Sequence, residues 1–96
     1  MTTPKTLALR NLAVNGRDWL LSKCAEECVE LAGAILKHQN KGESEDAIFQ
    51  EMGDVKIALE TLSAVYGRAR IEAHKAAKIA RIEAKVKELE GRLLDV

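Results

Sequence analysis

The sequence predicts an all-α protein, and three observations lead to this prediction. The 96 residues include fourteen alanines, twelve leucines and many Glu, Lys and Arg side chains but a single proline, a composition that favours helices. Apolar residues recur at intervals of three and four, the spacing that places them on one face of a helix. Runs of β-branched residues are absent. We therefore expect a bundle of helices and no sheet.

The first element is expected to be short. Thr3 followed by Pro4 matches the N-cap and first residue of a helix. Asn15 and Gly16 form a turn signal that stops it. Residues 1–17 are therefore predicted to be a short or weakly ordered N-terminal element.

Two long helices are expected in the centre of the chain. The first begins with a cap at Asp18, runs to about Gln39 and ends at Gly42. The second begins after a cap at Ser44 and ends before Gly67. Their apolar stripes are Leu21, Cys24, Cys28, Leu31 and Ile35 on the first helix, and Ile48, Val55, Leu59, Leu62 and Val65 or Tyr66 on the second.

A fourth long helix is predicted over residues 69–94. Its apolar positions step by four, four, three, four, three and four, which is a coiled-coil repeat with Lys75 as its one polar member. A chain of this size has more apolar stripe than it can cover alone. We therefore expect one domain over 1–96 that completes its helical bundle as a homodimer or homotetramer. The stripe is Ile71, Lys75, Ile79, Ile82, Val86, Leu89 and Leu93.

Charge and composition argue against several classes of function. Fifteen basic and fifteen acidic residues give a net charge of zero, so no strong attraction to nucleic acid or to an anionic membrane is expected. No apolar run approaches a membrane span, and the N-terminus does not resemble a secretory signal. Two cysteines do not make a disulfide framework, which agrees with a cytoplasmic location.

Acidic residues interrupt the apolar stripes of both central helices. Glu51 falls in the core stripe of the second helix, and Asp54 follows three residues later on the same side. On the first helix, a second stripe runs beside the one that begins at Leu21, and Glu27 falls in this second stripe. Glu30 follows three residues later. Each helix therefore offers a pair of carboxylates at matched spacing, on or beside its buried face.

Four carboxylates close together need compensation, because buried like charges repel one another. Either Lys and Arg side chains pair with them, or they bind a divalent cation. Oxygen ligands without cysteine or histidine favour Mg²⁺, or Mn²⁺, over zinc. The alternative is that these carboxylates lie on ordinary solvated helix faces.

The acidic residues also form a recognisable two-part motif. The pattern EExxE at 26–30, followed after twenty residues by ExxD at 51–54, resembles the signature of the MazG-like all-α nucleoside triphosphate pyrophosphohydrolases. The resemblance covers about residues 20–62. It implies a helical enzyme that forms a dimer, or a tetramer of two dimers.

The resemblance implies Mg²⁺-dependent cleavage of a nucleoside triphosphate between its α- and β-phosphates, which gives a monophosphate and pyrophosphate. By position in the motif, the implied metal ligands are Glu27, Glu30, Glu51 and Asp54. Glu27 or Glu30 could also take the proton of the attacking water. Glu26 matches the first motif residue, and it either orients a ligand or faces solvent.

Basic residues of the fourth helix are candidates for contact with the substrate phosphates. Members of the family often carry such residues on the following helix, and Lys75, Lys78 and Arg81 lie in that region. Trp19 could stack on a base, or it could belong to the core or an interface. The preferred base and sugar stay open.

A non-catalytic function is the alternative hypothesis. The repeat of the fourth helix alone would support dimerisation or packing on a partner helix. In a helical interaction module of this kind, Glu27 and Glu51 would pair with Lys or Arg across an interface. Stabilisation by Mg²⁺ together with a nonhydrolysable nucleotide would distinguish the enzyme from the module.

Overall fold

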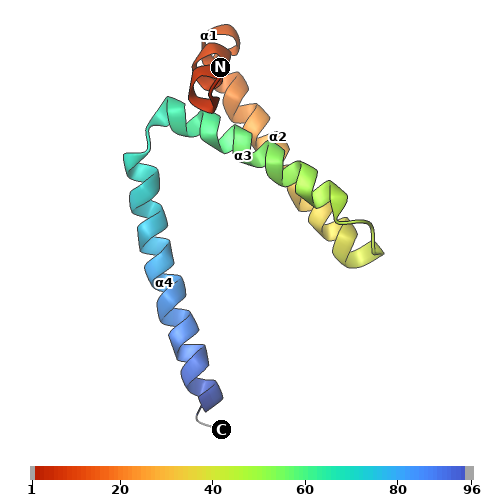
Figure 1. The fold of residues 1–96 in the computed structure, drawn as a ribbon, viewed down its shortest axis with the longest axis vertical. Helices are drawn as coiled ribbons and strands as arrows, with labels where there is room; N and C mark the ends of the chain where they lie inside the picture. Colours follow the sequence, from red (N-terminus) through yellow and green to blue (C-terminus); the bar gives the residue numbers. More distant parts are fainter. Residues whose placement is uncertain (1, 95–96) are drawn as a thin grey trace. The chain divides into compact units, whose positions relative to one another are not determined.

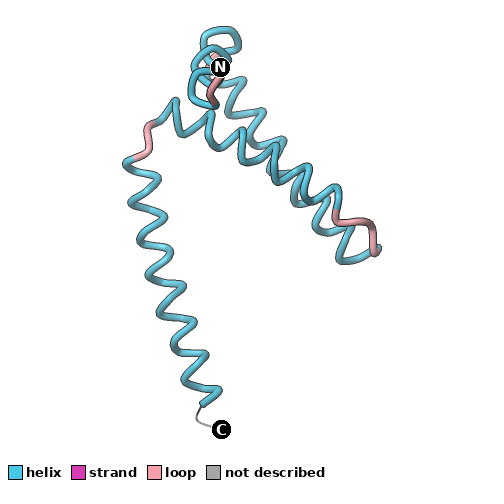
Figure 2. The backbone as a smooth tube through the Cα atoms, in the orientation of Figure 1, coloured by secondary structure: helices cyan, strands magenta, loops and turns pink. Residues whose placement is uncertain are grey.

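The computed structural model describes residues 2–94, and in this part of the chain helices are joined by short connections, with no strand (Figures 1 and 2). The all-α prediction is therefore confirmed. The chain divides after Tyr66 into two compact units, of which the first holds three helices and the second holds one. The helices are α1 (Pro4–Asn15), α2 (Arg17–Lys41), α3 (Asp46–Tyr66) and α4 (Ala69–Leu94).

Helix starts in the first unit follow the predicted signals with one exception. The Thr3 hydroxyl accepts a hydrogen bond from the backbone N–H of Thr6 at 3.1 Å and caps α1 as expected. The predicted cap at Asp18 is wrong, because α2 begins at Arg17 directly after Gly16. Gly16 has a φ of 83°, a conformation that glycine adopts without strain and that lets the chain reverse within one residue. Asp18 instead lies in the first turn of α2, where its charge suits the helix dipole.

The connection between α2 and α3 is short and held by local hydrogen bonds. Gly42 is left-handed, with a φ of 67°, and its N–H donates to the carbonyl of His38. The Nδ1 of His38 donates to the carbonyl of Glu43 at 2.6 Å, so the connection folds back along the end of α2. The hydroxyl of Ser44 accepts from the N–H of Asp46 at 3.1 Å, at the start of α3. As a result, α2 and α3 lie side by side and antiparallel (Figure 1).

The first unit has a thin core. Its buried apolar residues among those described are Ala8 of α1, Leu20 and Cys24 of α2, and Val55 of α3. Helix α1 contacts α3 more extensively than it contacts α2. The core places the α2–α3 interface along the stripe that contains Glu27, which is also buried.

The apolar stripe predicted for α2 is buried only in part. Cys24 is buried and Leu31 is half-buried, whereas Leu21 and Cys28 are exposed and Ile35 is 38% exposed. The exposed members lie up to about 100° around the helix from Leu20 and Glu27, on the side that α3 covers least.

The second unit is one uninterrupted helix. Gly67 precedes it with a φ of 87°. None of the α4 residues is buried, and ion pairs three or four residues apart run along its surface. Within the described range, none of the helices combines the length and the apolar character that crossing a membrane requires.

Candidate functional site

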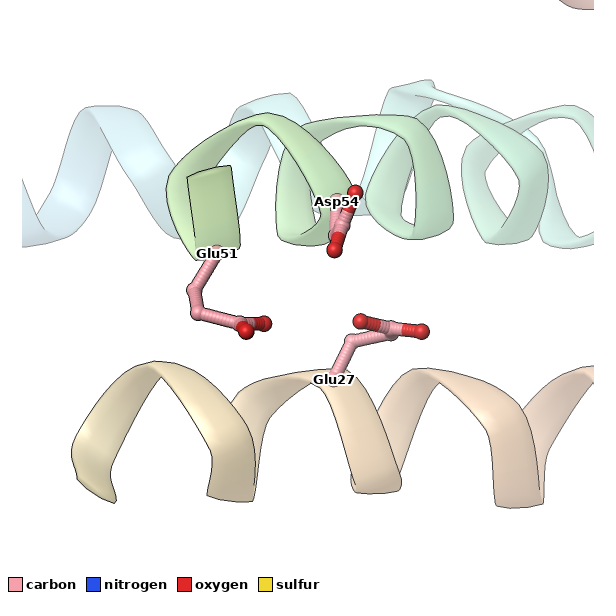
Figure 3. A group of neighbouring side chains, drawn as sticks. All are labelled: Glu27, Glu51 and Asp54. Carbon is pink, nitrogen blue, oxygen red and sulfur yellow. The ribbon is translucent and has the colours of Figure 1, made fainter. Parts of the chain in front are cut away.

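Three carboxylates from two helices converge inside the first unit. Glu27 projects from α2, and Glu51 and Asp54 project from α3 into the same space (Figure 3). One carboxylate oxygen of each residue lies within 4.8 Å of the corresponding oxygens of the other two. This group, which we call the acidic cluster, is small enough for a single cation to be within reach of all three side chains.

Local structure explains why the three side chains meet. Glu27 continues the buried stripe of Leu20 and Cys24 at helical spacing, so it must face α3. Glu51 and Asp54 are three residues apart, one turn along the same side of α3. The antiparallel packing of α2 and α3 then sets the two acidic faces opposite each other.

The acidic cluster is buried without full compensation. Glu27 is only 8% exposed and Glu51 is half-buried, whereas Asp54 lies at the exposed end of the cluster. The Oε2 atoms of Glu27 and Glu51 are buried, and neither has a hydrogen-bond partner within residues 2–94. Unpartnered buried carboxylate oxygens are costly, so this arrangement favours an additional positive group at the cluster.

Lys23 supplies part of that compensation. Lys23 lies one turn before Glu27 on α2, and its Nζ is 3.2 Å from Oε1 of Glu27. The hydrogen bond to Glu27, and then the charge of Glu27, raise the pKa of Lys23. This is the only ion pair formed by residues of α1 to α3 in the described part of the chain. The single positive charge of this half-exposed lysine therefore balances only part of the negative charge of the three carboxylates.

Glu30, the fourth predicted ligand, lies at the margin of the acidic cluster. It is exposed and is not one of the three residues whose oxygens converge. Its pKa is nevertheless raised, first by the charge of Glu27, then by partial loss of water and by the charge of Glu51. Glu26 adds to the same effect from the exposed side of α2. Glu30 therefore experiences the negative charge of the cluster.

A cavity of about 260 Å³ opens beside the acidic cluster. Glu27 and Asp54 form part of its wall, so the carboxylates and the cavity share one space. Its other lining side chains combine an aromatic ring with polar groups from three helices. Among them are Asn11, Trp19, Lys23, Cys24 and Thr61.

Trp19 is placed on this wall rather than in the core. It remains 44% exposed, which leaves much of its ring accessible from the cavity side or from solvent. Both earlier interpretations, base stacking and an interface position, are compatible with such exposure.

Sequence reasoning did not single out Lys23, Asn11 or Thr61. The spacing of four between Lys23 and Glu27 on one helix is a signal that could have found the ion pair. Asn11 comes to the cavity only because α1 folds back on the α2–α3 pair, which no local pattern shows.

The predicted phosphate contacts lie in the second unit. Lys75, Lys78 and Arg81 are all exposed on α4, and Lys75 pairs with Glu72 of the same helix at 3.5 Å. Their role at the substrate stays a prediction.

Comparisons of the chain with protein-family models, with curated proteins and with solved structures give no match. The functional argument therefore depends on the acidic cluster, the cavity and the motif.

Proposed function

We propose that the chain is a Mg²⁺-dependent nucleoside triphosphate pyrophosphohydrolase of the MazG-like all-α type. The observation that carries this proposal is the pair of buried, unpartnered oxygens of Glu27 and Glu51, set within reach of Asp54 across two helices. A divalent cation satisfies such oxygens and neutralises their mutual repulsion.

The donor set fits magnesium. Three carboxylates supply hard oxygen ligands, and no cysteine or histidine belongs to the group, although Cys24 is on the adjoining cavity wall. Bound there, Mg²⁺ would supply charge neutralisation at phosphate oxygens and Lewis acidity. Mn²⁺ meets the same requirements.

The cavity beside the cluster suits the nucleoside end of the substrate. Its volume lies just below the range of about 300–1,000 Å³ that small-molecule sites occupy, so it would take part of a nucleotide, with the phosphates at the acidic cluster. Trp19 offers an aromatic face, and Asn11 and Thr61 offer hydrogen-bonding groups. Lys75, Lys78 and Arg81 of α4 lie in the second unit, and their contact with the phosphates stays a prediction from the resemblance.

The proton of the attacking water would pass to a carboxylate of α2. Water attacks the α-phosphorus, the bond to the bridging oxygen of the β-phosphate breaks, and pyrophosphate leaves. Glu30 and Glu27 are both candidates for this proton. Glu30 lies at the exposed margin of the acidic cluster, whereas Glu27 is buried and paired with Lys23.

Oligomerisation would complete the helical bundle. The first unit leaves many large apolar side chains exposed, including Val29, Phe49 and Ile57, which are 71%, 65% and 61% exposed. A homodimer or homotetramer would cover part of this surface.

The test is release of pyrophosphate from the common NTPs and dNTPs in the presence of Mg²⁺, with the full chain. At least one nucleotide should give equimolar monophosphate and pyrophosphate, and chelation of the metal should stop the reaction. Asp54→Asn should lower kcat/KM by about 100-fold or more, since even changes around metal ligands cost about 10–100-fold.

Glu60→Gln is the matched control for the acidic cluster. Glu60 is an exposed glutamate of α3, nine residues after Glu51, which places it on the opposite side of the helix. Its substitution should leave the rate unchanged. Absence of pyrophosphate with every nucleotide, or equal losses in the Asp54 and Glu60 variants, would overturn the proposal and favour the non-catalytic module.

A further inference from the structure

The second unit carries an exposed apolar stripe along α4, which we call the α4 seam: Ile79, Ile82, Val86, Leu89 and Leu93. Its side chains are between 44% and 77% exposed, and the surface groove along its middle has a volume of about 460 Å³. Alternating steps of three and four are the repeat of a coiled coil, in which such a stripe is covered by another helix. Contiguous exposed apolar surface of this kind marks an interaction site.

The two flanks of the α4 seam carry opposite charges. With Ile79 and Val86 at position a of the heptad, the basic residues Lys78, Lys85 and Arg92 all fall at position g. The acidic residues Glu83 and Glu90 both fall at position e, on the other flank. One flank is therefore basic and the other acidic between residues 78 and 92.

This pattern is complementary to itself in one orientation only. In a parallel coiled coil, position g of one helix faces position e of the next heptad in the other helix. Lys78 would then face Glu83 of a second copy, and Lys85 would face Glu90 of that copy. In an antiparallel pair, position g faces g and e faces e, which would bring like charges together.

We propose that the α4 seam binds the α4 seam of a second copy of this chain, in parallel and in register, as a two-stranded coiled coil. Val86 at position a with Leu89 at position d favours two strands, whereas the preceding heptad has isoleucine at both positions, Ile79 and Ile82, which by itself favours a higher number. The experiment below therefore counts the strands. Lys75 occupies the preceding position d and pairs with Glu72 of its own helix, so the apolar contact begins at Ile79.

The ion pairs within α4 do not oppose this pairing. Lys85 lies 3.4 Å from Glu88 and Glu83 lies 3.1 Å from Lys87, but all four side chains are at least 49% exposed. Exposed pairs of this type contribute little free energy and rearrange readily. Exchange of one partner for a carboxylate or ammonium group of the second copy therefore costs little.

The experiment measures the mass and association constant of the full chain by sedimentation, with charge variants of the α4 seam. The wild type should form a species that contains two chains, or a multiple of two. Lys85→Glu alone and Glu90→Lys alone each turn both facing pairs into repulsive ones, and each should weaken association by about tenfold. An equimolar mixture of the two variants should restore it, because the mixed pair is complementary at both contacts.

Arg81→Glu is the matched control. Arg81 is an exposed basic residue of α4 at position c, outside both flanks and the groove, so the same change of charge there should leave association unchanged. Leu89→Gln should weaken association, and mixing it with either charge variant should not restore it. Circular dichroism checks that each variant keeps its helices.

Several results would overturn the inference. They are a monomeric wild type, a mass of three chains, unchanged association in both charge variants, or failure of the mixture to restore it. Unchanged association in the variants would instead assign any dimer to the first unit. The α4 seam contains no residue of the acidic cluster. Loss of pyrophosphate release in the Asp54 variant and loss of association in the α4 variants can therefore be observed independently.

Discussion

Glu27 and Glu51 face each other across the α2–α3 interface, and each keeps one buried carboxylate oxygen without a hydrogen-bond partner in the described range. Two groups of like charge are thus held together by the packing of the helices around them. Such an arrangement is unfavourable in the absence of a cation, so the repulsion should lower the stability of the metal-free protein.

The first prediction concerns the metal-free stability of Glu51→Ala. In EDTA, its melting temperature should equal or exceed that of the wild type, because one of the repelling charges is removed. Addition of Mg²⁺ should raise the melting temperature of the wild type more than that of the variant. A loss of about 3–5 kcal/mol in EDTA, the cost of stranding a buried ion-pair partner, would contradict this and favour salt bridges across an interface. Glu60→Ala is the control.

The second prediction concerns Lys23, the cation nearest to the acidic cluster. Lys23→Met should lower the melting temperature of the metal-free protein slightly, because buried Glu27 loses its 3.2 Å partner while the lysine itself is half-exposed. Saturating Mg²⁺ should shrink this difference, since the metal replaces the lost positive charge. Melting curves with and without Mg²⁺ measure both effects. A difference that Mg²⁺ leaves unchanged would show that the metal binds elsewhere.

The third prediction concerns pH and Glu30. Because the folded protein raises the pKa of Glu30 above its usual 4.5, the folded state binds more protons than the unfolded state between the two values. Its contribution to stability is therefore fully present below pH 4.5 and is lost as the pH rises through the raised pKa. Denaturant unfolding in EDTA, at a series of pH values, should show this slope in the wild type. Glu30→Gln should lack it, and parallel profiles of the two proteins would refute the coupling.

The fourth prediction concerns the two thiols. Cys28 is exposed, whereas Cys24 is buried and its burial raises the pKa of its thiol. A thiol-specific reagent should therefore modify one cysteine rapidly and the other slowly in the native protein, and both rapidly after unfolding. Cys28→Ser should abolish the fast phase. Equal native rates would show that the packing of α2 against its neighbouring helices does not keep Cys24 covered.

The helices of the first unit were predictable because their signals are local. Thr3, Gly42 and Gly67 end or begin helices through their own backbone or side-chain chemistry, so they can be read from one short stretch of sequence. Asp18 shows the limit of such reasoning. An acceptable capping residue was present, but the turn at Gly16 starts the helix two residues earlier than a cap at Asp18 would.

The acidic cluster was predictable in part, since Glu27 and Glu51 are polar residues inside apolar stripes. The exposed position of Glu30 was not, because which side of α2 faces α3 depends on packing between helices rather than on spacing within one. The same dependence explains why Leu20 rather than Leu21 is buried. The cavity beside the cluster depends in addition on where α1 folds back, and no pattern in the sequence carries that information.

The connection at residues 42–45 is short, and the hydrogen bond from His38 to Glu43 holds it along the end of α2. Beyond it, the approach of the three carboxylates depends on spacing within α3. One residue inserted between Ile48 and Glu51 would turn Glu51 and Asp54 by about 100° relative to the start of the helix, away from Glu27. The spacing of residues along α3 is therefore as much a requirement for the acidic cluster as the identity of the carboxylates themselves.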